Sequence, residues 1–184
     1  MDYARTQKDI QWAVAQHLSP LTLTLLNPSK LATLTTKQLV SQPKPLFIYL
    51  CDKLWPANTA NRCHVLMAHA ALEGNFENVE QCRAWILADG ETPNYYWVMA
   101  RAAYGGHLDL VEQCRAWMLE DGETPKYNWT MASAAEGNHP EIVKQCRKWI
   151  LAAGKIPNYD RVMAWATERG HENLLAQLEV WQQE

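Results

Sequence analysis

The sequence of 184 residues has no long apolar run, no block of basic residues and only two phenylalanines. Its apolar runs are far shorter than the roughly 18–20 residues that a membrane-spanning helix needs, so we expect no membrane span. The opening residues, MDYARTQKDIQ, are polar and lack the apolar core of a secretory signal. A net charge of −3 gives no electrostatic basis for binding nucleic acid or an anionic membrane.

Five cysteines is an odd number, and three of them recur at one spacing within helical patterns, unlike a disulfide framework. We therefore expect a reduced, intracellular protein of the cytoplasm. Nine tryptophans against two phenylalanines is the unusual feature of the composition. Most of these tryptophans fall at recurring positions, so their number reflects internal repetition.

From about residue 64 the chain repeats itself every 32 residues. The recurring residues include Met67, Met99, Met131 and Met163, Cys82, Cys114 and Cys146, Trp85, Trp117, Trp149 and Trp181, and Tyr95, Tyr127 and Tyr159. A fixed period of this length predicts a stack of two-helix units and hence an all-α fold. The repeat domain is expected over 61–184, with repeats at 64–95, 96–127, 128–159 and 160–184, the last a C-terminal cap.

Each repeat predicts two helices joined by a tight turn. Helix A covers the segment in which Met99, Ala102 and Ala103 share one face. A residue type that tolerates a left-handed turn follows, at Gly74, Gly106, Asn138 and Gly170. Helix B begins beside a histidine, because Pro140 directly follows His139 and proline is favoured in the first helical position. The expected inner face of helix B is Leu108, Val111, Cys114, Trp117 and Met118, and the glycines that end this helix are Gly90, Gly122 and Gly154.

Residues 1–60 lack the repeat and are expected to form an N-terminal helical extension or cap. Apolar spacing predicts a helix over 2–18, which stops at a Ser-Pro pair. The segment 21–26, LTLTLL, fits either a strand or the start of a short helix.

A helix pair is expected in the second half of this extension. Thr35 or Thr36 can cap a short helix that runs to Val40, and an apolar helix covers 46–54. This pair, within 31–60, is either a decayed repeat or an unrelated cap that shields the first repeat from water.

The pattern A-A-x-x-G-H-x-x-x-V, as in Ala102, Ala103, Gly106, His107 and Val111, resembles the central part of the ankyrin repeat. The resemblance covers about residues 64–184, with a period of 32 in place of the usual 33. Ankyrin repeats open helix A with T-P-L-H, whereas this chain has W-V-M-A at 97–100. The start of the helix must therefore be made differently.

Asn128 and Asp160 can cap two of the A helices, whereas Tyr96 cannot cap the third. The short linker DGETPNY at 89–95 leaves open whether the β-fingers of ankyrin units are present. The longer pattern M-A-x-A-A-x-G-G-H…V…C-R-x-W also resembles the divergent ankyrin-type repeats of large DNA viruses of amoebae. These resemblances imply an ankyrin-like helical-repeat solenoid that recognises proteins through its loop tips and helix A, without cofactor or catalytic residues.

The cysteine and histidine positions are the first candidates for chemistry. The fourth repeat has Leu178 in the cysteine position, so we interpret that position as apolar packing rather than a redox or metal site. Cys63 and His64 lie near His69 but lack a second ligand pair at zinc spacing, and no metal is expected. The recurring histidine is replaced by Asn75 in the first repeat, which favours a helix N-cap over a catalytic base.

The recurring tryptophans could form a stacking ladder for nucleic acid, as some single-strand binders do. Such a ladder needs basic residues on the same face, but each nearby arginine lies two positions before its tryptophan, as Arg115 does before Trp117. The acidic net charge argues further against it. We therefore interpret the tryptophans as packing residues, and expect the recurring tyrosines to pack beneath the linkers.

Specific binding is expected from positions that vary while the framework is kept. The candidate partner-binding residues are Tyr96, Arg101, Tyr104, Asn128, Ser133, Glu136, Asp160, Trp165 and Glu168. The sequence thus favours a non-enzymatic protein-interaction scaffold, and the viral resemblance suggests a viral protein that engages a host factor. The alternative is a structural or assembly protein, self-associating or part of a virion, with residues 20–56 as the contact. An enzyme is not expected, because no nucleophile, base and oxyanion site can be assembled, and the protein is expected to be a monomer or a weak homo-oligomer.

Overall fold

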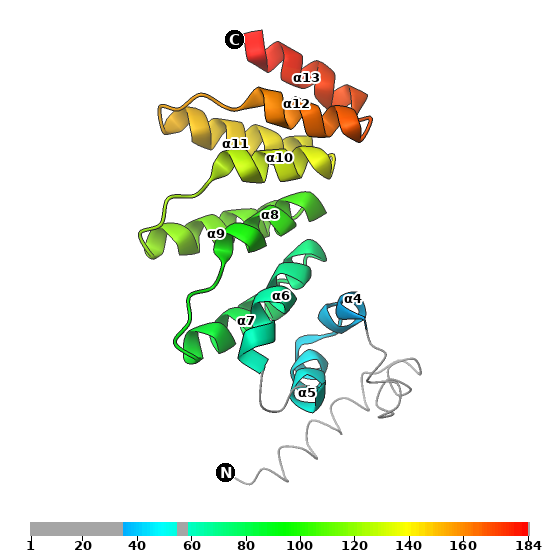
Figure 1. Ribbon diagram of the computed structural model, residues 1–184, viewed down its shortest axis with the longest axis vertical. Helices are drawn as coiled ribbons and strands as arrows, with labels where there is room; N and C mark the ends of the chain where they lie inside the picture. The colour runs from blue at the N-terminus through cyan, green and yellow to red at the C-terminus, as the bar shows by residue number, and fades with distance from the viewer. Residues whose placement is uncertain (1–34, 55–58, 184) are drawn as a thin grey trace. The chain divides into compact units, whose positions relative to one another are not determined.

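The computed structural model describes residues 35–54 and 59–183, and every regular element in these ranges is an α-helix (Figure 1). The expected all-α class is therefore confirmed for the part of the chain that is described. The helices are α4 (Thr36–Val40), α5 (Lys44–Leu54), α6 (Thr59–Leu72), α7 (Phe76–Ala88), α8 (Tyr95–Gly105), α9 (Leu108–Glu120), α10 (Tyr127–Glu136), α11 (Pro140–Ala152), α12 (Tyr159–Glu168) and α13 (Glu172–Gln183). The helix expected over 2–18 and the segment 21–26 lie outside the described residues.

The described residues divide into two compact units, one of residues 35–54, 59–70 and 77–92, the other of 71–76 and 93–183. In the first unit, Thr35 caps α4 as expected, in a reciprocal capping box with Gln38. Helix α5 begins at Lys44, two residues earlier than expected, because proline is tolerated in the first turn of a helix. The Asn78 side chain of α7 donates to the carbonyl oxygens of Val40 and Gln42, at 3.0 and 2.7 Å, and so ties α7 to the end of α4.

The second unit contains three helix pairs, α8 with α9, α10 with α11 and α12 with α13. Helix α10 packs against both α8 and α12, so the A helices follow one another as Figure 1 shows. The turn inside each pair is left-handed, with φ of +86° at Gly106, +62° at Asn138 and +71° at Gly170. These are the residues at which the sequence predicts that turn.

The buried faces of the helices follow the predicted spacing with one correction. Met99, Ala102 and Ala103 of α8 are buried, as expected for helix A. On α9 the buried set is Leu110, Val111, Cys114, Trp117 and Met118. Leu110 takes the place predicted for Leu108, which is half-buried, because Leu108 is the first residue of its helix.

The linkers between pairs are not hairpins: residues 121–126 and 153–158 contain no strand. The expected caps at Asn128 and Asp160 are wrong, because helix A begins two residues earlier than supposed. Asn94 and Asn158 are the capping residues, and their side chains accept from the backbone N–H groups of Trp97 and Arg161. The Asn128 side chain instead accepts from the backbone N–H of Asn158, at 2.9 Å, and joins one linker to the next.

Candidate functional site

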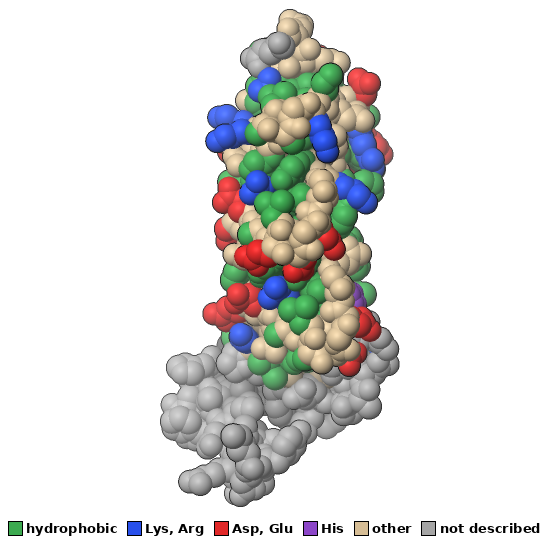
Figure 2. Space-filling view, turned by 90° about the vertical axis from the view of Figure 1, so that its left-hand side faces the viewer, with side chains coloured by type: hydrophobic (Ala, Val, Ile, Leu, Met, Phe, Trp, Pro, Cys, Tyr) green, Lys and Arg blue, Asp and Glu red, His purple; other side chains and the backbone are tan. Residues whose placement is uncertain are grey.

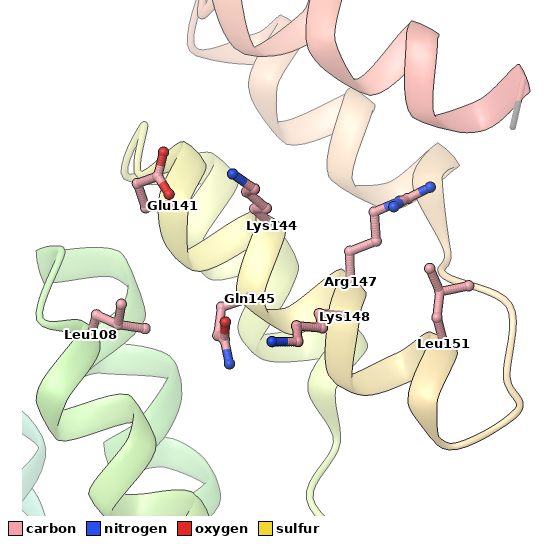
Figure 3. A pocket seen from close by; sticks show the side chains of 7 residues that line it. All are labelled: Leu108, Glu141, Lys144, Gln145, Arg147, Lys148 and Leu151. Atoms are coloured by element: carbon pink, nitrogen blue, oxygen red, sulfur yellow. The ribbon is translucent and has the colours of Figure 1, made fainter.

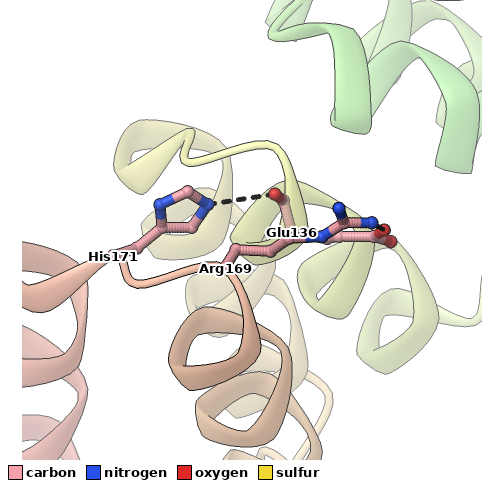
Figure 4. Close-up of polar contacts among 3 residues, drawn as sticks. All are labelled: Glu136, Arg169 and His171. Carbon is pink, nitrogen blue, oxygen red and sulfur yellow. Dashed lines mark hydrogen bonds and ion pairs between the residues drawn. The ribbon is translucent and has the colours of Figure 1, made fainter.

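The recurring histidine connects successive repeats, which corrects its predicted role as an N-cap. His107 and His139 occupy the N-cap position of α9 and α11, but neither side chain bonds to its own helix. Their Nε2 atoms instead lie 3.0 Å from the carbonyl oxygens of Leu72 and Tyr104, each at the end of the preceding helix A. His171 meets the carbonyl oxygen of Glu136 in the same way, at 3.1 Å (Figure 4). The imidazoles therefore satisfy carbonyl groups that a helix end leaves without partners.

Glu136, one of the predicted binding residues, takes part in this connection through its side chain as well. Its carboxylate forms an ion pair with the guanidinium of Arg169, which lies beside it in Figure 4. The hydrogen bond and the charge of Glu136 together raise the pKa of Arg169. Because its carboxylate is already paired with Arg169, Glu136 contributes to the contact between repeats.

The recurring arginine contacts the tryptophan of the following repeat, a pairing between repeats that its spacing from the tryptophan of its own repeat does not reveal. The guanidinium of Arg115 lies 5.1 Å from the ring centre of Trp149, in the following repeat, and its Nε donates to the hydroxyl of Tyr127 at 2.9 Å. Arg147 repeats the arrangement with Trp181, at 5.5 Å, and with the hydroxyl of Tyr159. Arginine, tyrosine and tryptophan thus form a half-buried structural ladder within the second unit.

The cysteines are buried, as the packing interpretation expects. Burial raises the pKa of Cys114 to about 12 and also raises that of Cys146, so both thiols keep their protons at neutral pH. In the first unit a hydrogen bond from Cys82 lowers the pKa of Cys63, while burial raises that of Cys82.

No group of three potential metal ligands occurs among residues 35–54 and 59–183. His64 lies 2.9 Å from the carboxylate of Glu91.

The structure spreads the nine predicted binding residues along the A helices and their starts. Tyr96, Asn128 and Asp160 lie in the first turns of α8, α10 and α12, and only Asp160 among them is fully exposed. Half-buried residues of the set further along are Arg101, Tyr104, Ser133, Glu136 and Trp165, while Glu168 is exposed. Arg101 stacks on Tyr104 of its own helix, with 5.8 Å from guanidinium to ring centre. The set does not converge on one pocket.

A better-defined candidate site than the nine predicted residues lies at the starts of the same helices, where Trp97 and Trp129 are 40% and 48% exposed. Two cations cover neighbouring rings: the Lys126 ammonium lies 4.1 Å from the ring centre of Tyr96, and the Arg161 guanidinium 4.4 Å from that of Trp129. We refer to Tyr96, Trp97, Lys126, Trp129 and Arg161 together as the aromatic–cation surface. Figure 2 views the repeats from the side on which the linkers lie and shows hydrophobic side chains among basic and acidic ones on that face.

The aromatic–cation surface is hollowed between α8 and α10. Tyr96, Trp97, Lys126 and Trp129, with Asn94, line an open depression of about 380 Å³. The Tyr96 hydroxyl is buried and has no hydrogen-bond partner among the residues the structure describes. Tyr96 was predicted, but Trp97, Lys126, Trp129 and Arg161 were not. The sequence does hold a signal that this position is exposed. The equivalent residues of successive repeats are Trp97, Trp129 and Arg161, and a position that accepts arginine is not a core position.

A second hollow lies on the B helices, away from the variable positions. It has a volume of about 440 Å³ and is lined by Leu108 of α9 and by residues of α11 (Figure 3). The α11 residues are Glu141, Lys144, Gln145, Arg147, Lys148 and Leu151. Figure 3 shows their side chains fanning out along the helix rather than converging on one point.

Two further findings bear on the kind of protein. No helix within the described ranges is both long enough and apolar enough to cross a lipid bilayer. Comparison of the chain with protein-family models, with curated proteins and with solved structures gives no match. The geometry of the helix pairs and of the aromatic–cation surface is therefore the basis for assigning a function.

Proposed function

We propose that this chain is a non-enzymatic scaffold of ankyrin-like repeats that binds a partner protein through the aromatic–cation surface. The observation that carries the proposal is the exposure of Trp97 and Trp129, at 40% and 48%, beside Lys126 and Arg161. Tryptophan, tyrosine and arginine are the residues most enriched at the energetic centres of protein interfaces. Binding would remove water from both indole rings, whose exposure in the free protein costs hydrophobic free energy.

The helix pairs support the ankyrin-like part of the proposal. The A-A-x-x-G-H pattern lies at a left-handed turn between two antiparallel helices, and the histidine joins neighbouring repeats. The linkers at 121–126 and 153–158 contain no strand, so the proposal relies on the edge of the repeats formed by the starts of the A helices, where Trp97 and Trp129 are exposed. The proposal places recognition at that edge, in a cytoplasmic protein, and includes a viral protein that engages a host factor.

A scaffold fits the chemistry of the described residues better than an enzyme does. Cys114 and Cys146 are buried thiols whose raised pKa leaves them protonated and poor nucleophiles. His107, His139 and His171 use Nε2 on backbone carbonyl groups, so they are structural. The two hollows described above are open depressions.

The test is affinity capture from cell lysate with three forms of the full chain, read by quantitative mass spectrometry. The forms are wild type, the double variant Trp97→Ala/Trp129→Ala, and the control Leu119→Ala/Leu151→Ala. The control leucines are 47% and 46% exposed, so they match the tryptophans in exposure but lie on the B helices. We expect a partner protein that wild type and the leucine variant retain and that the tryptophan variant loses by at least about tenfold.

Circular dichroism and thermal unfolding of each form establish that the variants remain folded. Equal recovery of every captured protein by wild type and by the tryptophan variant would show that the aromatic–cation surface is not the binding site. Loss of the partner in the leucine variant alone would move the binding site to the B helices.

A further inference from the structure

We infer that the aromatic–cation surface recognises an extended acidic segment of the partner, with carboxylates placed against Lys126 and Arg161. This inference rests on the proposed function and adds the chemistry of the bound segment. Both cations are exposed, and neither has a carboxylate within 4.0 Å among residues 35–54 and 59–183. They differ in this respect from Arg169, whose charge is paired with Glu136.

Each cation lies over an aromatic ring, which orients it without neutralising it. Lys126 lies over Tyr96 at 4.1 Å and Arg161 over Trp129 at 4.4 Å. Stacking leaves the N–H donors at the edge of a guanidinium free to bind a carboxylate, often by two hydrogen bonds. A carboxylate on the segment would therefore meet a pre-oriented donor beside an apolar ring.

The spacing of the helices fits an extended segment. Lys126 immediately precedes α10 and Arg161 lies in the first turn of α12, and these two helices pack directly on each other. Packed helices lie about 8–10 Å apart, and an extended chain rises about 3.3 Å per residue. Carboxylates about three residues apart would thus reach both cations, and the residues between them would cover Trp129.

The hollow between α8 and α10 gives the segment a place for an apolar side chain. Tyr96, Trp97 and Trp129 supply three aromatic walls of this depression of about 380 Å³. A proline or aromatic ring next to the first carboxylate would pack there, since aromatic walls favour flat apolar groups. Two nearby carboxylates would repel the segment: Asp160, which is exposed and adjacent to Arg161, and the exposed Glu123, which lines a hollow together with Lys126.

The experiment selects linear dodecapeptides from a random phage-displayed library on the full chain. Affinities of the enriched peptides, made synthetically with a fluorescent label, are then measured by anisotropy. The inference predicts enrichment of peptides with aspartate or glutamate about three residues apart and a net negative charge. Affinity should fall at least about tenfold with Lys126→Gln/Arg161→Gln, and also with Trp97→Ala/Trp129→Ala. It should rise with Asp160→Asn and fall as salt concentration increases.

The control is Lys144→Gln/Lys148→Gln, which removes two exposed positive charges from α11 and should leave the affinity unchanged. Neutral or basic peptides that depend on the tryptophans but not on Lys126 and Arg161 would overturn the acidic inference and leave the proposed function standing. Failure to enrich any peptide, or peptides insensitive to both double variants, would overturn the inference, and the capture experiment decides the proposed function separately. A single-stranded oligonucleotide that binds as tightly, through the same cations, would show general anion binding and also overturn it.

Discussion

At the scale of single residues, the recurring histidines show that the position of a side chain on a helix does not by itself determine its hydrogen-bond partner. The histidines lie at the start of helix B, where an N-cap is expected, yet their Nε2 atoms reach the preceding repeat. Sequence reasoning could predict that this position forms a hydrogen bond, because Asn75 replaces the histidine in the first repeat. It could not predict the partner, since the partner depends on how one repeat is rotated against the next.

The buried Cys114 gives a prediction about alkaline pH. Its pKa is raised by burial to about 12, from an ordinary value of 9.0, so the folded thiol stays protonated where the unfolded thiol ionises. Its stabilising contribution is therefore complete below pH 9 and is lost as the pH rises towards 12, at about 1.4 kcal/mol per pH unit. Urea unfolding between pH 8 and pH 10.5 should show a shallower decline of the unfolding free energy for Cys114→Ala than for wild type. Parallel curves would mean that the thiol ionises equally in both states.

At the scale of helices and turns, the sequence is most informative where one residue type is required by backbone geometry. Left-handed φ values at Gly106, Asn138 and Gly170 confirm the turns that the sequence predicts. The start of helix A was predicted two residues too late, because Asn128 and Asp160 are as suited to capping as Asn94 and Asn158, which do cap α8 and α12. Trp97 and Trp129 were missed for another reason: repeated tryptophans elsewhere in the chain are packing residues, and these two are exposed.

Alanine substitutions at Gly106 and Gly122 separate the destabilisation caused by a clash between repeats from that caused by a strained backbone. Both have positive φ, +86° and +74°. A methyl group on Gly106 would collide with the imidazole of His139, whereas one on Gly122 would meet nothing within 4 Å. We expect Gly122→Ala to cost about 1–2 kcal/mol through the backbone alone, and Gly106→Ala to cost at least about 1 kcal/mol more through overpacking. Urea unfolding of both variants measures this, and equal losses would show that the histidine moves aside freely.

At the scale of the whole molecule, the repeats of the second unit depend on their immediate neighbours. Helix α10 contacts α8 and α12, and α12 contacts α13, so packing passes from one pair to the next. The period of the sequence was sufficient to predict this succession, because each unit buries its apolar face only against adjacent units. The aromatic–cation surface is a product of the same succession, since its residues come from the starts of three successive A helices.

This organisation predicts that damage to the last pair stays local. Leu178 of α13 is fully buried, and Leu178→Ala should cost about 2–5 kcal/mol of packing free energy. Because α13 packs against α12, amide hydrogen exchange should accelerate in α12 and α13 and remain unchanged in α8 and α9. Val180, in the same helix but 58% exposed, supplies the control substitution Val180→Ala, which should leave exchange as in wild type. Mass spectrometry of peptide fragments reads each helix separately. An equal acceleration of exchange from α8 to α13 would show that the second unit opens as one cooperative body. Unfolding of α12 and α13 would then also unfold the helices that carry the aromatic–cation surface.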